Sequence, residues 1–139
     1  MKKLIILFMA LLCFFNMAAM FESFNYMQPE KLKGLIEAGT QPIIVDIQVE
    51  DEFTAHHFPG SIETNAFPVK TDAQRKQIDV AVKAYKVTGD NVVVVCPRGG
   101  GGAKRCYAYL KSQGVPEEKL TILEGGIAKW PYSGLLAKK

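Results

Sequence analysis

The sequence predicts an α/β fold with a mainly parallel central sheet and helices on both of its faces. Short apolar runs rich in β-branched residues alternate along the chain with segments whose apolar residues recur at helical spacing. Three such runs are Pro42–Asp46, Val92–Val95 and Leu120–Leu123. Strands that are apolar throughout are typical of a sheet covered on both faces. A chain of 139 residues is long enough for one domain with a real core.

Composition and charge exclude several classes of protein. The chain is 48% hydrophobic and 22% charged, as expected of a globular protein. Its formal charge of +3 includes Lys2 and Lys3, without which 15 basic and 14 acidic residues remain. This balance gives no indication of nucleic-acid binding. Besides Cys13 there are only Cys96 and Cys106, so we expect neither a disulfide framework nor a zinc site.

Residues 1–20 have the layout of a secretory signal, and residues 27–139 are expected to form the domain. Two lysines precede the apolar run Leu4–Phe15, and small residues follow at positions 18 and 19. This pattern predicts export to the periplasm or cell envelope. The cleavage site lacks a second small residue, and Leu4–Phe21 is nearly long enough to cross a bilayer. An uncleaved membrane anchor is therefore the alternative.

The first half of the domain shows clear helix signals. Pro29 suits the first position of a helix that ends before Gly39. Glu50–Phe53 resembles the acid-rich first turn of a short helix, and another short strand is expected near Ile62. These elements surround the strand at Pro42–Asp46.

The second half continues the alternation of helices and strands. Thr71 and Gln74 form a capping-box pattern at the start of one predicted helix. Its apolar face is expected to carry Ile78, Val82 and Tyr85. A further helix is expected after the glycines at 99–102, with its core positions at Ala103, Cys106 or Tyr107, and Leu110. The segment Glu124–Trp130 is expected to turn into a short terminal helix.

Cys96 directly follows the strand Val92–Val95, at the sheet edge where ligands bind in open α/β sheets. The glycines after it can turn successive backbone N–H groups inward, and these groups favour negative charge. We therefore expect an exposed, nucleophilic thiolate at Cys96. Two alternatives are that Cys96 merely ends a buried strand, or that the loop binds phosphate. The second is less favoured, because Ala103 and Arg105 replace the glycine and the Ser/Thr of that motif.

Several motifs occur together between Gln28 and Trp130. In order, they are Val45-Asp46-Ile47, Glu52-Phe53, His57-Phe-Pro-Gly60, Cys96 before its glycine loop, and Leu123-Glu-Gly-Gly126 with Trp130. In this order they resemble a single-domain rhodanese. The resemblance implies a sulfurtransferase that takes sulfur from a small anion, thiosulfate or polysulfide, and holds it as a persulfide on the catalytic Cys96. A thiol or cyanide would accept the sulfur, and neither a cofactor nor a metal is expected. The substrate-binding residues implied by the resemblance are Pro97, Arg98, Gly99, Gly100, Gly101, Gly102 and Ala103.

The loop departs from the pattern of the family. Rhodanese loops usually carry a basic residue near the far end, where Gly101 and Gly102 stand here, so Arg98, Lys104 and Arg105 remain as candidates. Because the glycines offer little side-chain charge, we expect polysulfide to be preferred over thiosulfate. The loop is one residue longer than is common, as in related phosphatases, but it lacks their final arginine. A non-catalytic sulfur carrier or interaction module is the alternative function.

Other polar and reactive residues have structural interpretations. Adjacent histidines such as His56 and His57 point apart and lack a third metal ligand, so we expect a structural His57 and a solvated His56. Asp46 ends a strand near Cys96 and is expected to hold neighbouring loops. Cys106 has the spacing of a core residue, although a resolving thiol is the alternative. Gln48 replaces an arginine that is frequent in the family.

Overall fold

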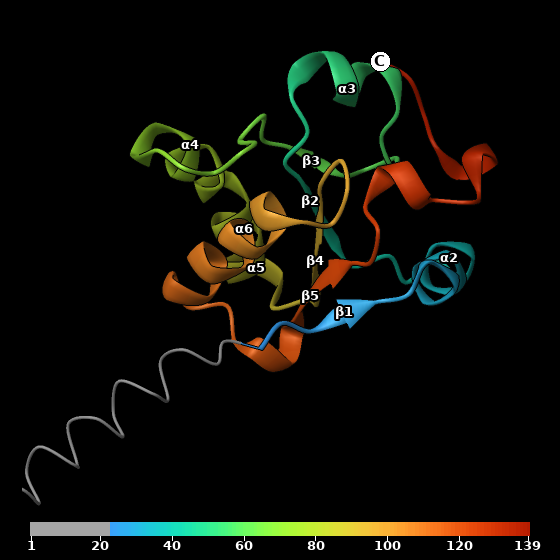
Figure 1. Ribbon diagram of the computed structural model, residues 1–139. Helices are drawn as coiled ribbons and strands as arrows, with labels where there is room; N and C mark the ends of the chain where they lie inside the picture. Colours follow the sequence, from blue (N-terminus) through green and yellow to red (C-terminus); the bar gives the residue numbers. More distant parts are fainter. Residues whose placement is uncertain (1–22) are drawn as a thin grey trace, which may run out of the picture.

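The computed structural model describes residues 23–139, so the predicted export signal at residues 1–20 lies outside the described part of the chain. Five parallel strands form one sheet in the order β1-β5-β4-β2-β3 (Figure 1). The strands are β1 (Tyr26–Met27), β2 (Ile43–Asp46), β3 (Ile62–Glu63), β4 (Val92–Val95) and β5 (Leu120–Leu123). The prediction of a mainly parallel sheet is confirmed.

Helices cover both faces of this sheet. They are α2 (Pro29–Glu37), α3 (Glu50–Ala55), α4 (Asp72–Gln77), α5 (Asp79–Thr88) and α6 (Gly101–Ser112). Figure 1 shows α5 and α6 on one side of the sheet and α2 on the other, beside the C-terminal segment. The predicted first position of Pro29 in α2 is observed, and Gly89 ends α5 in a left-handed conformation.

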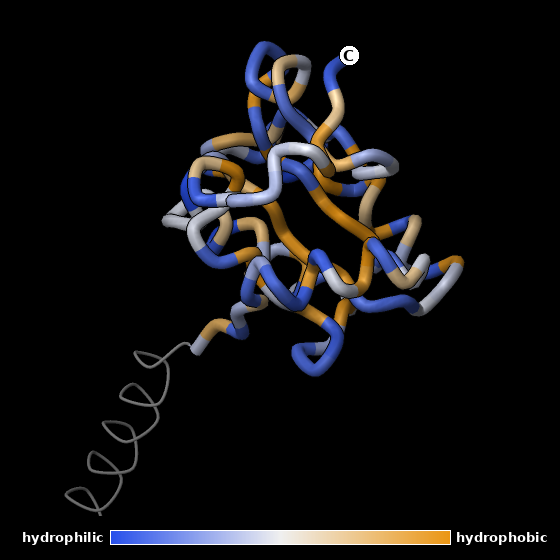
Figure 2. The backbone as a smooth tube through the Cα atoms, turned by 90° about the vertical axis from the view of Figure 1, so that its right-hand side faces the viewer, coloured by the Kyte–Doolittle hydropathy of each residue, from blue (hydrophilic) through white to orange (hydrophobic). Residues whose placement is uncertain are grey.

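Alternation along β4 divides the interior into two cores. Val92, Val94 and the following Cys96 belong to the core beneath α5 and α6, whereas Val93 and Val95 belong to the core beneath α2. The most hydrophobic parts of the chain accordingly run through the centre of the molecule in Figure 2. Such alternation is the two-residue period of a strand that is buried on both faces.

The helix predicted to start at Thr71 is two helices. The capping box is present, because the Gln74 amide donates to the Thr71 hydroxyl and the Gln74 side chain accepts from the Thr71 amide. The helix breaks at Ile78, whose amide donates to the Arg75 carbonyl, a bond that tightens the last turn of α4. Ile78 is fully buried while α4 buries no residue. The break thus places Ile78 in the core and leaves α4 on the surface.

The predicted terminal helix is also different in the structure. Two short 3₁₀ turns, Ile127–Lys129 and Ser133–Leu135, take its place. Pro131 separates them, and the preceding Trp130 is extended with φ −69° and ψ 115°. A proline disfavours helical backbone in the residue before it, which explains the interruption. Within residues 23–139 no helix has the length and apolar character needed to span a membrane.

Candidate active site

The Cys96 sulfur lies at the start of a loop that joins the carboxyl end of β4 to α6. The backbone amide of Gly99 donates a hydrogen bond to this sulfur across 2.6 Å. Gly99 has a left-handed φ of 72°, which glycine adopts readily and which turns its amide back toward the sulfur. Helix α6 begins two residues later with no acidic residue in its first turn. The amide and the helix N-terminus both stabilise negative charge on the sulfur.

A cavity of about 310 Å³ opens over the loop. Its lining comprises Glu52, Phe67, Cys96, Pro97, Arg98, Gly100, Gly101, Gly102 and Arg105. The cavity therefore combines the thiol with backbone groups of the loop and with two guanidinium groups. Its size suits a small ligand rather than a protein chain.

The expected exposure of Cys96 is wrong. Only 2% of the residue is exposed, and it packs in the same core as Ala103 and Cys106. The two-residue period of β4 directs Cys96 toward α6, beneath the glycine loop, instead of toward solvent. The thiol still lines the cavity.

The loop is held from behind by the turn that follows β5. The amide of Ile127 donates to the Cys96 carbonyl at 3.0 Å, and the amide of Ala128 donates to the Pro97 carbonyl at 2.9 Å. A Cβ atom on Gly126 would overlap the Cys96 carbonyl oxygen and would lie 2.8 Å from the Gly99 nitrogen. The lack of a side chain on Gly126 thus lets the backbone of this turn meet the backbone of the Cys96 loop.

The predicted substrate-binding residues fall into three groups. Pro97, Arg98 and the glycines at 100–102 line the cavity. Gly99 contributes the amide that reaches the sulfur. Ala103 is fully buried in the core and is not among the lining residues, because the first turn of α6 directs it toward the sheet.

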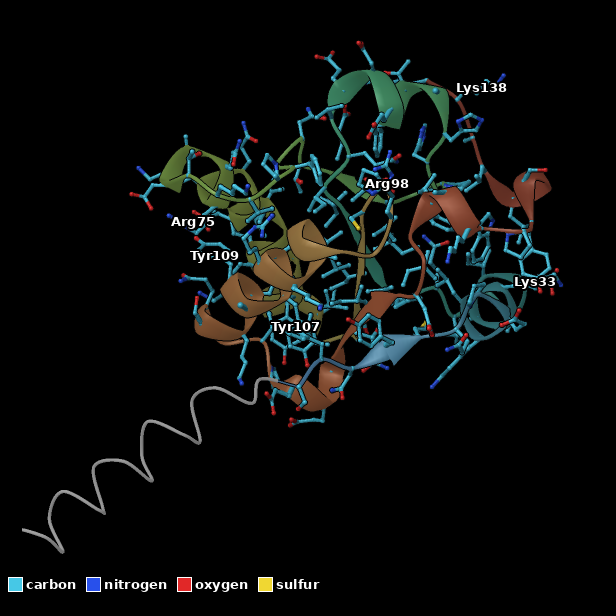
Figure 3. The ribbon with its side chains drawn as sticks, in the orientation of Figure 1. Lys33, Arg75, Arg98, Tyr107, Tyr109 and Lys138 are labelled. Carbon is cyan, nitrogen blue, oxygen red and sulfur yellow. The ribbon has the colours of Figure 1, made fainter. Side chains whose placement is uncertain are left out.

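The candidate basic residues are also separated by the structure. Arg98 and Arg105 line the cavity, and Figure 3 shows the Arg98 side chain between the loop and α3. The Lys104 ammonium instead lies 5.6 Å from the centre of the Phe24 ring, away from the cavity lining. The cavity therefore has two cationic side chains, both of them exposed arginines.

Two further lining residues were not predicted. Glu52 lies in an acid-rich helix turn and in the Glu52-Phe53 motif of the family, but neither pattern indicated a place in the cavity. Phe67 carries no sequence signal, because it lies in an irregular segment between β3 and α4. A second hollow of about 300 Å³ shares Glu52, Pro97 and Arg98 with the first.

Asp46 has the expected structural role and does not line the cavity. Its carboxylate is buried and accepts two hydrogen bonds from Gln48, from the backbone amide at 2.8 Å and from the side-chain amide at 2.9 Å. Gln48 also donates to the His56 carbonyl at 2.9 Å. Burial raises the pKa of Asp46 to about 6, against the opposing effect of the two Gln48 hydrogen bonds. Gln48 thereby ties the end of β2 to the end of α3.

The remaining reactive residues are structural. His57 shares a hydrogen bond between Nδ1 and the Phe53 carbonyl at 2.8 Å and stacks on the Phe53 ring at 4.2 Å. His56 is exposed, as expected. Cys106 is fully buried, and burial raises the pKa of its thiol far above the usual range. In the described part of the chain, no group of three or more His, Cys, Asp or Glu residues is arranged to hold a metal ion.

The domain is an α/β fold with a parallel sheet, and a thiol lies at the carboxyl end of the central strand, facing a loop of backbone groups. These features define a class of cysteine-dependent domains. The chain belongs to the rhodanese-like domain family, whose model matches residues 28–132. A rhodanese-like domain protein from Staphylococcus aureus has a similar structure, with a TM-score of 0.62 and 20% identity over 84% of this chain and 99% of that one. The comparison with curated protein sequences found no match.

Similar structures also come from proteins that are named for different activities. A thiosulfate sulfurtransferase from Pseudomonas aeruginosa gives a TM-score of 0.55 at 18% identity, over 84% of this chain and 20% of the other. A yeast protein tyrosine phosphatase of the rhodanese family gives 0.60 at 16% identity, over 81% of this chain and 88% of the other. At these identities the likeness establishes the fold alone.

Proposed function

We propose that the protein is an exported sulfurtransferase that carries sulfane sulfur on Cys96. The observation that supports this function best is the hydrogen bond from the Gly99 amide to the Cys96 sulfur at the floor of the cavity. A persulfide is anionic near neutral pH, and backbone amides hold an anion without a proton-transferring partner. The donor is a small sulfur anion and the acceptor is a thiol or cyanide.

The chemistry balances without an external oxidant or reductant. With thiosulfate as donor, the Cys96 thiolate attacks the outer sulfur, a new S–S bond forms, and the bond to the sulfonate group breaks. Sulfite leaves with the bonding electron pair, and Cys96 carries an anionic persulfide. An acceptor thiolate then attacks the terminal sulfur and restores the Cys96 thiolate. Both steps require a good leaving group, and neither requires a general base.

The decisive experiment replaces Cys96 with Ser. We expect Cys96→Ser to abolish both the persulfide mass adduct and thiocyanate release from cyanide, because a serine hydroxyl is not ionised at neutral pH. Intact-mass spectrometry after incubation with thiosulfate or polysulfide detects the adduct. An adduct without turnover would support a sulfur carrier, and neither adduct nor turnover would support an interaction module. Transfer that persists in Cys96→Ser would contradict the proposed nucleophile.

A phosphatase is the second candidate, because a phosphatase of the rhodanese family shares the fold. The sequence disfavours it, since Gly102 occupies the end of the loop and cannot clamp phosphate with a bidentate fork. Hydrolysis of an aryl phosphate by the purified domain distinguishes the two activities.

Export to the periplasm or cell envelope is part of the same proposal. Its support is the sequence pattern of residues 1–20, two lysines followed by an apolar run. N-terminal sequencing of the protein recovered from cells tests it. A cytoplasmic protein that retains Met1 would contradict export, and a membrane-bound protein that retains Met1 would support the anchor.

A further inference from the structure

Arg105 lies one helical turn beyond the loop and folds back over its glycines. Its Nε donates to the Pro68 carbonyl at 3.0 Å, which fixes the plane of the guanidinium. A Cβ atom on Gly101 would lie 3.0 Å from Nη1 and 3.4 Å from Nη2 of Arg105. Side chains on a helix lean toward its N-terminus, which is the direction of the Cys96 loop. The guanidinium thus lies over the first turn of α6.

The two glycines at the start of α6 make room for this arrangement. Gly101 lies beneath the Arg105 guanidinium, and Gly102 lies beneath the Phe67 ring, whose atoms are 2.9 Å from an ideal Cβ on Gly102. Phe67, the loop glycines and Arg105 all line the cavity that contains Cys96. The absence of side chains at positions 101 and 102 therefore lets a cation reach the cavity from the second turn of the helix.

Nη1 and Nη2 remain available for a ligand. Within residues 23–139, Arg105 forms no ion pair, and its hydrogen bond to the Pro68 carbonyl uses only Nε. Arg98 lines the same cavity but has no side-chain hydrogen bond to residues 23–139, so only Arg105 is held in a fixed direction. Glu52 contributes one carboxylate to the lining, against the two guanidinium groups. The cavity is thus net positive and has one oriented fork of N–H donors.

We infer that Arg105 binds the oxyanion end of the sulfur donor and makes the cavity selective for thiosulfonate-type donors over polysulfides. This inference rests on the sulfurtransferase function proposed above. A planar guanidinium matches the paired oxygens of a sulfonate, whereas a polysulfide chain has no such oxygens. When the bond to the sulfonate breaks, charge develops on the departing sulfite. Arg105 stabilises that charge as well as the bound donor, so the expected preference is opposite to the one drawn from the glycines alone.

The first experiment compares donors across Arg105→Gln, Arg105→Lys and Lys104→Gln. For thiosulfate, Arg105→Gln should lower kcat/KM about 10- to 100-fold, the range expected for a charge-assisted hydrogen bond. Arg105→Lys should fall between it and the parent, because lysine keeps the charge but lacks the fork. Polysulfide turnover should change less than about threefold. Lys104→Gln is the matched control, since it removes the neighbouring charge outside the cavity lining, and thermal melts establish that each variant is folded.

Equal losses with both donors, an unchanged reaction with thiosulfate, or equal effects of Arg105→Gln and Lys104→Gln would each overturn the assignment. A second experiment does not depend on sulfur transfer: sulfate is titrated into Cys96→Ser by calorimetry at constant ionic strength. Adding Arg105→Gln should weaken sulfate binding at least about tenfold. If the wild-type protein transfers no sulfur but Arg105→Gln still weakens sulfate binding tenfold, the proposed function is wrong and the oxyanion site is supported. An unchanged sulfate affinity overturns the site even where transfer is active.

Discussion

The backbone of Gly126 lies so close to the backbone of Cys96 that Gly126 has no room for a side chain. An added Cβ on Gly126 would overlap the Cys96 carbonyl and come within 2.7 Å of the Arg98 nitrogen. Gly126 also has φ 61° and ψ −162°, a conformation essentially restricted to glycine. The turn after β5 therefore sets the position of a loop that precedes it by thirty residues in the chain.

We expect Gly126→Ala to disturb the active site and the fold together. The strained backbone and the overlap should lower the free energy of unfolding by about 2–5 kcal/mol, and the displaced loop should lose the bond between the Gly99 amide and the Cys96 sulfur. Persulfide formation should fall accordingly. Denaturant unfolding and intact-mass kinetics measure the two effects.

Gly34→Ala is the matched control for this change. Gly34 lies within α2 with no atom within 4 Å of an added Cβ, so alanine there should stabilise the helix by up to about 1 kcal/mol and leave transfer unchanged. If Gly126→Ala behaved like Gly34→Ala, the turn after β5 would have no part in shaping the loop.

Much of the fold follows from local signals in the sequence. The strands at Val92–Val95 and Leu120–Leu123 have the predicted bounds, because β-branched and other apolar runs between turn residues leave little ambiguity. Strand β1 was not predicted. Its two residues are too few to show the alternation of a strand, and its pairing with β5 is a tertiary contact. The break at Ile78 was not predicted for a similar reason. Neither glycine nor proline marks it, and the burial of Ile78 is visible only in the folded core.

The parts of the site that depend on neighbouring residues in the sequence were predictable. The parts that depend on tertiary contacts were not. The position of Cys96 at the end of a core strand and the role of the glycine loop could be read from adjacent residues. The burial of Cys96 beneath the loop was not predicted. Alternate residues of a strand point to opposite faces of the sheet, but the sequence does not show which face α6 covers. Phe67 and the return of Arg105 over Gly101 were equally hidden, since each depends on how the segment after β3 packs against α6.

The buried carboxyl of Asp46 gives the protein a distinct pH dependence. Its pKa is raised to about 6 when folded, so between about pH 4 and pH 6 the folded state binds more protons than the unfolded state. Stability from this group is therefore greatest below about pH 4 and is lost as the pH rises to about 6. Relative to Asp46→Asn, the wild-type protein should lose up to about 3 kcal/mol across this window. Urea unfolding of both proteins at several pH values measures the difference, and a wild-type stability that rose relative to that of Asp46→Asn with increasing pH would contradict the burial effect.

We expect Gln48 to reduce the free-energy cost of burying the Asp46 carboxylate. In Gln48→Leu the carboxylate loses its side-chain donor and the His56 carbonyl loses a partner, so stability at pH 7 should fall by about 1–3 kcal/mol. The Asp46 pKa should rise further, since the side-chain bond from Gln48 holds it down. The ¹³C carboxyl shift of Asp46, followed by NMR through a pH titration, reports this change directly. Gln113→Leu is the control: it removes an exposed side-chain amide that donates a hydrogen bond to Ser112, and it should leave the Asp46 titration unchanged.

The two thiols of the domain should respond oppositely to chemical modification and to substitution. Cys106 is fully buried and its pKa is raised by that burial, so its thiol stays protonated and inert at neutral pH. Cys96 receives an amide hydrogen bond and lines the cavity, so iodoacetamide should alkylate it first in the folded protein, and Cys106 only on unfolding. Cys106→Ser should lower the free energy of unfolding by about 1–3 kcal/mol, because it places a hydroxyl in an apolar core, while leaving most sulfur transfer intact. Peptide mapping of the alkylated protein, thermal melts and single-turnover transfer test these expectations together. Loss of transfer in Cys106→Ser at a temperature where the variant is fully folded would show that Cys106 takes part in the chemistry, against its structural assignment.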